Sequence, residues 1–176
     1  MKTSVLLILV ALFQVSILVG QESLKLSPDG FNSVIISSEE LSASELYKKT
    51  IDWVGTTFKN PDLVIKSKIE DEKIRIDGHM SNAWYYSSMG NKIYYGLDYT
   101  LTISFKDGRY KVELAINRFT DKGATAMHKL SHFYKEDGTI RKMYLDSPSS
   151  LENSVNALIS SLHNYINNGG VKNEDW

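Results

Sequence analysis

The stretch LDYTLTISFKDGRYKVELAINRF, residues 97–119, gives the clearest structural signal in the sequence. At its centre, Asp107-Gly108 suits the two positive-φ positions of a type I′ turn, so the sequence predicts a β-hairpin. That turn fixes a register that pairs Lys106 with Arg109, Phe105 with Tyr110, Ile103 with Val112, Leu101 with Leu114 and Tyr99 with Ile116. The apolar pairs then share one face, and a slip of one residue would exchange the two faces, so the register is well specified.

The opposite face of this hairpin is polar. It carries the pairs Thr102 with Glu113 and Ser104 with Lys111. Antiparallel strands with one apolar and one polar face commonly pack one side on a core and leave the other in water. We therefore expect the hairpin to belong to a sheet that is covered on one side only.

Residues 43–58 are predicted to form a helix ahead of this hairpin. Ser42 and Glu45 have the spacing of a capping box, in which each side chain satisfies a backbone amide of the other residue. Apolar side chains then recur at helical spacing, at Tyr47, Ile51, Val54 and Phe58. Asn60-Pro61 follows and ends the helix.

Between the helix and the hairpin the apolar period changes to two, which is typical of strands. Two such runs, at 63–69 and 74–80, flank the acidic link Glu70-Asp71-Glu72, which we expect to be a turn. This second hairpin is predicted to pair Ile69 with Ile74, Ser67 with Ile76 and Leu63 with Met80. A further short β-prone run at 31–37 precedes the helix.

A second amphipathic helix is predicted from Ser147-Pro148 to about residue 166. Proline is well suited to the first position of a helix. The apolar stripe consists of Leu151, Val155, Leu158, Ile159, Leu162 and Ile166. The residues from Asn167 to Gly170 are expected to end the helix by left-handed capping or fraying.

These elements predict an α+β domain of two layers. A curved antiparallel sheet of about five strands would carry both helices on one face, in the order β-α-β-β-β-β-α. We expect this single domain to span residues 33–168, after a polar, turn-rich leader at 21–32 and before a flexible tail at 169–176. A chain of this length buries enough surface to fold without a metal or a disulfide.

The N-terminus is typical of a secretory signal peptide, because Lys2 is followed by an apolar run from Val5 to Val19 and then by Gly20. We expect residues 1–20 to be removed; an uncleaved membrane anchor is the alternative, since the run approaches a membrane-spanning length. The chain contains no cysteine, which excludes disulfides, a cysteine nucleophile and a lipoprotein anchor. An exported bacterial protein, periplasmic or secreted, is therefore favoured.

The charge balance argues against a nucleic-acid partner. The sequence has 20 Lys and Arg against 21 Asp and Glu, and a pI of about 6.4. It therefore lacks the basic field that binding to DNA or RNA requires. After the signal peptide, no second apolar run is long enough to span a membrane.

Three stretches, in this order and at this spacing, resemble a known family. They are SASELYKKTIDWVGTTFKNPDLVIKSK at 42–68, KIRIDGH at 73–79 and LTISFKDGRYKVEL at 101–114. Over about residues 34–119 the chain resembles exported bacterial domains of unknown function with a TATA-binding-protein-like (TBP-like) fold. The resemblance implies the fold and an exported location, but no established activity and no catalytic residue. DNA binding, which the name of the fold suggests, is opposed by the charge balance and by export.

No catalytic or metal-binding set can be assigned from the sequence. His128 and His132 would share one face of a helix and bind a metal there, but on a strand they would lie about 13 Å apart. The serines lack a nucleophile-elbow motif, and the acidic turn at 70–72 lacks the alternation of a calcium loop. We therefore expect ordinary surface histidines and serines, with no metal and no cofactor.

The most unusual segment lies between the two hairpins and is rich in aromatic residues. Trp84, Tyr85, Tyr86, Tyr94 and Tyr95 supply contact area at a low cost in entropy, so they are the candidate binding residues. The alternative is that these rings extend the strands and pack on the sheet or under the helices.

A non-enzymatic binding module is the favoured function. Its partner would be a protein, a peptide, a glycan or a small apolar ligand, held on the aromatic surface or in a groove between the sheet and the helix at 148–166. The alternative is a hydrolase whose dispersed catalytic residues meet only in the fold. That alternative requires a pocket where two or more of His79, His128 and His132 converge with acidic residues.

Overall fold

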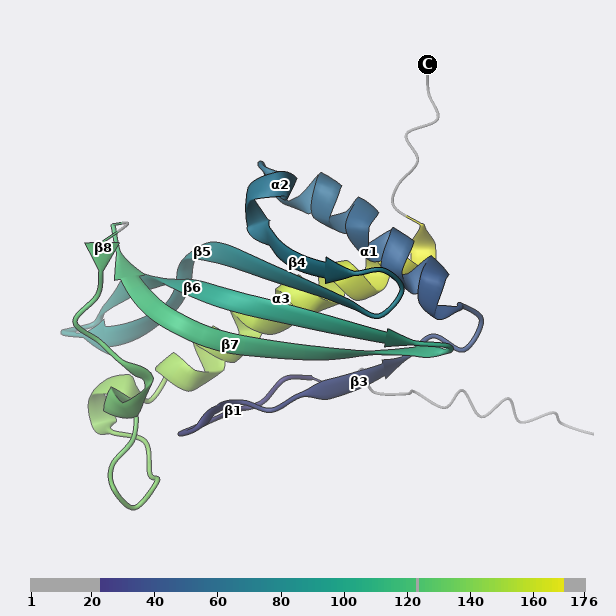
Figure 1. Ribbon diagram of the computed structural model, residues 1–176. Coiled ribbons are helices and arrows are strands. Elements are labelled where there is room, and N and C mark those ends of the chain that lie inside the picture. Colours follow the sequence, from purple (N-terminus) through teal and green to yellow (C-terminus); the bar gives the residue numbers. More distant parts are fainter. Residues whose placement is uncertain (1–22, 123, 170–176) are drawn as a thin grey trace, which may run out of the picture.

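The computed structural model describes residues 23–122 and 124–169 (Figure 1). The predicted signal peptide and most of the predicted tail lie outside these residues. The elements are β1 (Leu26–Ser27), β2 (Gly30–Phe31), β3 (Val34–Ser37), α1 (Ala43–Thr57), α2 (Pro61–Val64), β4 (Ile65–Ile69), β5 (Lys73–Ser88), β6 (Asn91–Lys106), β7 (Arg109–Asp121), β8 (Ala124–Thr125), the 3-10 turns η1 (Leu130–His132) and η2 (Lys142–Tyr144), and α3 (Ser147–Asn168).

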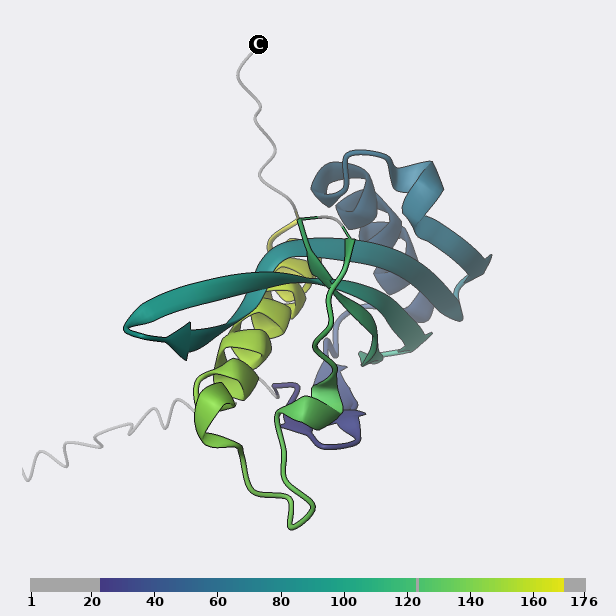
Figure 2. The same cartoon turned by 90° about the vertical axis from the view of Figure 1, so that its left-hand side faces the viewer.

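The predicted α+β class and two-layer architecture are confirmed. The main sheet is antiparallel with the order β3-β7-β6-β5-β4, and β8 pairs with the end of β7. Figure 2 shows the sheet as a curved layer with α3 running beneath it. Inward side chains of the strands and of α3 are fully buried against one another, among them Ile76, Leu101, Val112, Val155 and Leu162.

The β6–β7 hairpin has the predicted register in all five pairs, from Lys106 with Arg109 to Tyr99 with Ile116. The predicted type I′ turn is wrong, however, because Gly108 has a φ of 74° whereas Asp107 does not adopt a positive φ. The Asp107 carboxylate instead accepts a hydrogen bond of 2.9 Å from the backbone amide of Ala43, at the start of α1. The turn is thus shaped by its contact with the helix.

The predicted register of the β4–β5 hairpin is wrong. Ile69 pairs with Lys73 and Lys68 with Ile74, and an irregularity precedes the pair of Ile65 with Ile76. The three-residue turn at 70–72 places Asp71 at a positive φ of 58°, and this geometry shifts the register by one residue. Leu63 pairs with nothing in the sheet, because it lies in the short helix α2 and is 69% exposed.

Both long helices are confirmed, with ends close to those predicted. The capping box of α1 is formed: the Ser42 amide donates to Glu45 Oε2 at 2.8 Å, and the Glu45 amide donates to Ser42 Oγ at 3.3 Å. The C-terminal helix begins at Ser147 with proline in its first turn, and Gly169 ends it in the left-handed conformation at φ 68°. Within the described residues, no helix is both long enough and apolar enough to cross a membrane.

Residues 23–32 of the polar leader are built into the domain rather than lying ahead of it. Leu24 is fully buried, and its backbone exchanges two hydrogen bonds of 2.9 Å with the side-chain amide of Asn156 on α3. The Leu26 amide donates to Glu152 Oε1 at 2.8 Å. The small β1–β2 hairpin therefore lies against the C-terminal helix and beside β7, where it contributes to the pocket described below.

Candidate functional site

The β5–β6 hairpin carries all five candidate binding residues on its two strands. The two strands are joined by Met89 and Gly90, both at positive φ, so a turn of the I′ kind occurs here. Trp84 pairs with Tyr95, and Tyr85 with Tyr94. Because side chains alternate along a strand, Trp84, Tyr86 and Tyr95 share one face, and Tyr85 and Tyr94 share the other.

The first of these faces is part of the core. Trp84 is 0% exposed, and its ring lies 4.8 Å from the rings of Tyr95, Phe119 and Phe133. A large ring with apolar neighbours on several sides stabilises the fold by its burial. Trp84 is therefore not available to a partner at the surface, and the prediction of an exposed aromatic surface is corrected for this residue.

The second face is open. The rings of Tyr85 and Tyr94 lie 5.3 Å apart, and the ammonium of Lys92 sits 4.2 Å from the centre of the Tyr85 ring. Tyr94 is 49% exposed. A cation over an aromatic ring is a modest attraction at an exposed position. A binding role for Tyr85 and Tyr94 stays a prediction.

The segment between β8 and α3 covers the buried aromatic face. It contributes His128, Phe133 and Tyr144, whose rings contact Trp84 at 5.7, 4.8 and 6.4 Å. It is held in place by backbone hydrogen bonds, including one of 2.9 Å from the Ala126 amide to the Phe119 carbonyl. This segment, which has no helical or strand periodicity in the sequence, forms one wall of a pocket.

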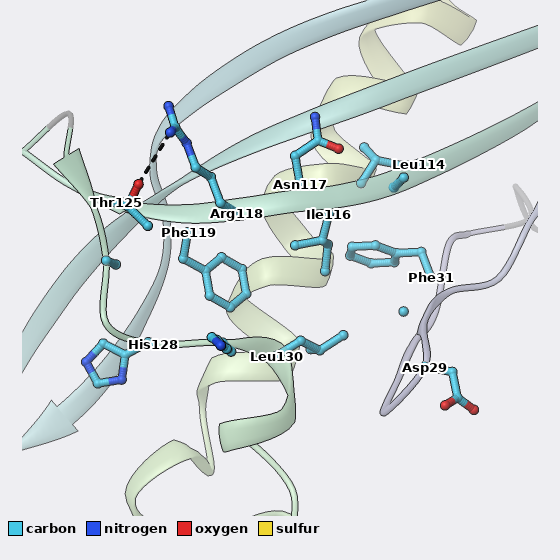
Figure 3. A pocket seen from close by; sticks show the side chains of 14 residues that line it. Asp29, Phe31, Leu114, Ile116, Asn117, Arg118, Phe119, Thr125, His128 and Leu130 are labelled. Carbon is cyan, nitrogen blue, oxygen red and sulfur yellow. Dashed lines mark hydrogen bonds between the residues drawn. The ribbon is translucent and has the colours of Figure 1, made fainter.

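That pocket has a volume of about 580 Å³ and lies where β7, the β1–β2 hairpin and the segment 125–130 meet (Figure 3). Its apolar lining comes from three separate stretches of chain: Phe31, Leu114, Ile116, Phe119, Ala126 and Leu130. In Figure 3 the rings of Phe31 and Phe119 approach it from opposite sides, and Asp29 and His128 lie at its margins. Arg118 bends away from this space toward Thr125, to which it donates at 3.3 Å.

His128 is a polar group of this pocket that its neighbours hold in place. Its Nδ1 shares a hydrogen bond of 2.7 Å with the Tyr144 hydroxyl, and its ring lies 4.8 Å from that of Tyr95. Burial lowers the pKa of His128, the nearby His132 lowers it further, and Asp121 opposes the shift only in part. The shift favours the neutral imidazole, which suits an apolar site.

The groove predicted between the sheet and the C-terminal helix is filled with side chains. Leu151, Val155, Leu162 and Ile166 of α3 are fully buried against the strands. The pocket of about 580 Å³ lies outside this interface, between β7, the β1–β2 hairpin and the segment 125–130. The prediction is wrong because the apolar side chains of α3 and of the sheet pack together as the core and fill the space between them.

The histidines of the hydrolase alternative do not converge in the way it requires. His128 lines the large pocket, whereas His79 lines a separate hollow and shares a 2.7 Å hydrogen bond with Asp98. His132 is the last residue of the 3-10 turn η1 and His128 precedes that turn, so neither lies on a regular helix or strand. Within residues 23–122 and 124–169, no group of three or more His, Asp or Glu side chains has the geometry to bind a metal.

Residues 33–120 match the family described as a domain of unknown function (DUF4468) with TBP-like fold. The chain belongs to this family. The match agrees with the resemblance predicted over about residues 34–119, and the DUF4468 assignment carries no activity with it. No curated protein shows significant similarity to the chain.

Two solved structures share the fold of this DUF4468 chain. One is a DUF4468 family protein from Bacteroides ovatus, with 18% identity and a TM-score of 0.50 over 82% of this chain and 88% of that one. The other is a TBP-like protein from Parabacteroides distasonis, with 13% identity and a TM-score of 0.52 over 78% of this chain and 89% of that one. At these identities the likeness establishes the fold alone, and the bacterial sources agree with the predicted origin.

Proposed function

We propose that this DUF4468 chain is a binding module that holds a small, largely apolar ligand in the pocket between β7, the β1–β2 hairpin and the segment 125–130. The observation that carries the proposal is the pocket itself. A volume of about 580 Å³ falls within the range of small-molecule sites, which are concave and lined mainly by apolar and aromatic side chains. Rings of Phe31 and Phe119 provide flat apolar walls.

Preorganisation supports the proposal. The wall formed by Phe119 rests on the buried aromatic cluster, since its ring stacks on that of Phe133 at 5.5 Å. The opposite wall is held by the hydrogen bonds that tie the leader to α3. A pocket whose walls are already fixed loses little entropy when a ligand binds.

The proposal is tested by filling the pocket with Ala126→Phe. Ala126 lines the pocket, so a phenyl group there occupies the space that a ligand would take. The probe is 8-anilino-1-naphthalenesulfonate, whose fluorescence rises when it enters an apolar site. We expect its affinity to fall by about tenfold or more in the variant, which corresponds to about 1.4 kcal/mol.

Ala124→Phe is the matched control, because Ala124 is exposed, lies two residues away and does not line the pocket. Thermal unfolding of both variants shows whether the fold is kept. Equal probe binding by both variants would contradict the proposal, as would loss of binding in the control.

We also propose that the protein is exported with removal of residues 1–20. The proposal rests on Lys2, the apolar run from Val5 to Val19, and Gly20. Intact-mass measurement of the protein from its own host tests it. A chain that starts at Gln21 in the periplasm or medium is expected, and a chain that retains Met1 in the membrane fraction would contradict it.

A further inference from the structure

The outer face of the sheet carries a chain of four hydrogen-bonded side chains, of which only Arg118 also borders the pocket described above. Ser81 Oγ lies 3.3 Å from His79 Nε2, and His79 Nδ1 lies 2.7 Å from Asp98 Oδ1. Arg118 Nε donates to the second carboxylate oxygen of Asp98 at 2.6 Å. Strand pairing creates this arrangement, because Asp98 on β6 lies directly opposite His79 on β5 and Arg118 on β7.

A β-bulge presents Ser81 beside the histidine. The register shifts between Met80 and Trp84, so three residues of β5 face the single Gly96 of β6. Asn82 within the bulge has a positive φ of 54°. Only glycine fits opposite it, because a Cβ at Gly96 would lie 2.4 Å from Thr120 Oγ1 and 2.9 Å from the Met80 carbonyl.

The bulge opens onto a hollow of about 270 Å³ on this outer face. Ser81 and His79 both line it, together with Asn82, Tyr94, Gly96, Thr120, Asp121 and Lys122. A small molecule in the hollow therefore meets the hydroxyl and the imidazole at once. Asn82 and Lys122 carry N–H donors of the kind that stabilise a developing oxyanion.

We propose that Ser81, His79 and Asp98 form a nucleophilic site that hydrolyses short-chain carboxylic esters. Ser81 is the nucleophile, His79 the general base and Asp98 the residue that orients the imidazole. A carboxylate on Nδ1 keeps the proton there and leaves Nε2 free to accept the serine proton, which is the geometry that activates a serine hydroxyl. At about 270 Å³ the hollow falls just below the usual range of small-molecule sites, so it suits a short acyl chain rather than a long one.

The reaction balances with water as the only co-reactant. Ser81 Oγ bonds to the carbonyl carbon, its proton passes to His79 Nε2, and the bond to the alcohol oxygen breaks as His79 gives the proton to the departing alcohol. Water then attacks the acyl-serine and loses a proton to His79. His79 returns that proton to Ser81 Oγ, and the carboxylic acid leaves.

Asp98 is held in its ionised form for this role. Partial burial disfavours the charge, but the hydrogen bonds from His79 and Arg118 and their attraction outweigh it, so the pKa of Asp98 lies below its ordinary value. Both carboxylate oxygens are engaged, which fixes the plane of the group. His79 therefore keeps its orientation even though the site is open to solvent.

The first test treats the purified full chain with a fluorophosphonate probe, whose phosphorus takes the place of the acyl carbon and loses fluoride. Intact mass and peptide mapping are expected to show one adduct, on Ser81. His79→Gln should slow labelling by about 100-fold or more, as loss of a general base does. Ser87→Ala is the control and should label normally, because Ser87 is an exposed serine of the same strand that donates to Asp146 instead of a histidine.

A second test does not depend on turnover. The chain has no cysteine, so Ser81→Cys introduces a single thiol. Beside His79 this thiol should react with iodoacetamide at pH 7 at least about tenfold faster than the same thiol in the double variant with His79→Gln. Equal rates, no fluorophosphonate adduct, or an adduct at another serine would each overturn the proposal; hydrolysis of p-nitrophenyl acetate that survives Ser81→Ala would also do so.

Discussion

Among single residues, Trp84 and Tyr94 show the difference between a core position and a surface position on the same hairpin. Its ring is fully buried among five other aromatic rings, so Trp84→Ala should lower the free energy of unfolding by about 3–5 kcal/mol. Tyr94→Ala, at a half-exposed position of the same hairpin, should cost about 1 kcal/mol or less. Urea unfolding measures both, and a similar cost for the two changes would contradict the assignment of Trp84 to the core.

His128 makes stability depend on pH. Its pKa is lowered in the folded chain, so on acidification the unfolded chain binds a proton first. Its contribution is therefore complete above the ordinary histidine value of about 6.5 and is lost as the pH falls through the folded pKa. His128→Phe keeps a ring but cannot titrate, and urea unfolding at pH 7.5 and 5.0 should show a smaller loss on acidification than in the parent chain. An unchanged loss would show that other groups cause it.

At the scale of elements, the β6–β7 hairpin was predictable and the β4–β5 hairpin was not. Strict alternation from Tyr99 to Ile116 leaves one register that buries apolar side chains, and the structure adopts it. β4 is an edge strand with mostly exposed side chains, so either register leaves Lys66 and Lys68 in solvent. The turn at 70–72 therefore sets the register of β4 with β5. The pocket was beyond prediction because one wall is the aperiodic segment 125–130, which only tertiary contacts position.

Strand pairing also explains why the Ser81-His79-Asp98 set was missed. His79 and Asp98 are 19 residues apart and come together only through the register of β5 with β6. The register predicted for the β6–β7 hairpin does not include this contact, because His79 lies on β5. An accurate register for β5 and β6 was the signal needed, together with the bulge that turns Ser81 toward the imidazole.

The contact between the β6–β7 turn and α1 gives a prediction at the same scale. The Asp107 carboxylate accepts from the Ala43 amide, one of the amides that a helix start leaves without an intrahelical partner. Asp107→Ala should therefore lower the free energy of unfolding by about 1 kcal/mol. Asp107→Asn keeps an acceptor oxygen and should cost clearly less, as urea unfolding would show; equal costs would contradict a capping role.

At the scale of the whole molecule, the TBP-like scaffold uses its two sides differently. The inner face is covered by α1, α3 and the segment between β8 and α3, and the pocket proposed to bind a ligand opens where that cover meets the β1–β2 hairpin. The outer face stays in solvent and carries the Ser81-His79-Asp98 set. Arg118 borders the pocket and also donates to Asp98, but the residues changed in the two tests differ, so each proposal stands or fails by its own test.

Native mass spectrometry shows whether the preformed apolar pocket binds a small molecule. The chain and its Ala126→Phe variant are produced in their own host and measured without denaturation. The account predicts that the parent chain retains an added small mass which the variant lacks. The same added mass in both proteins, or none in either, would contradict it.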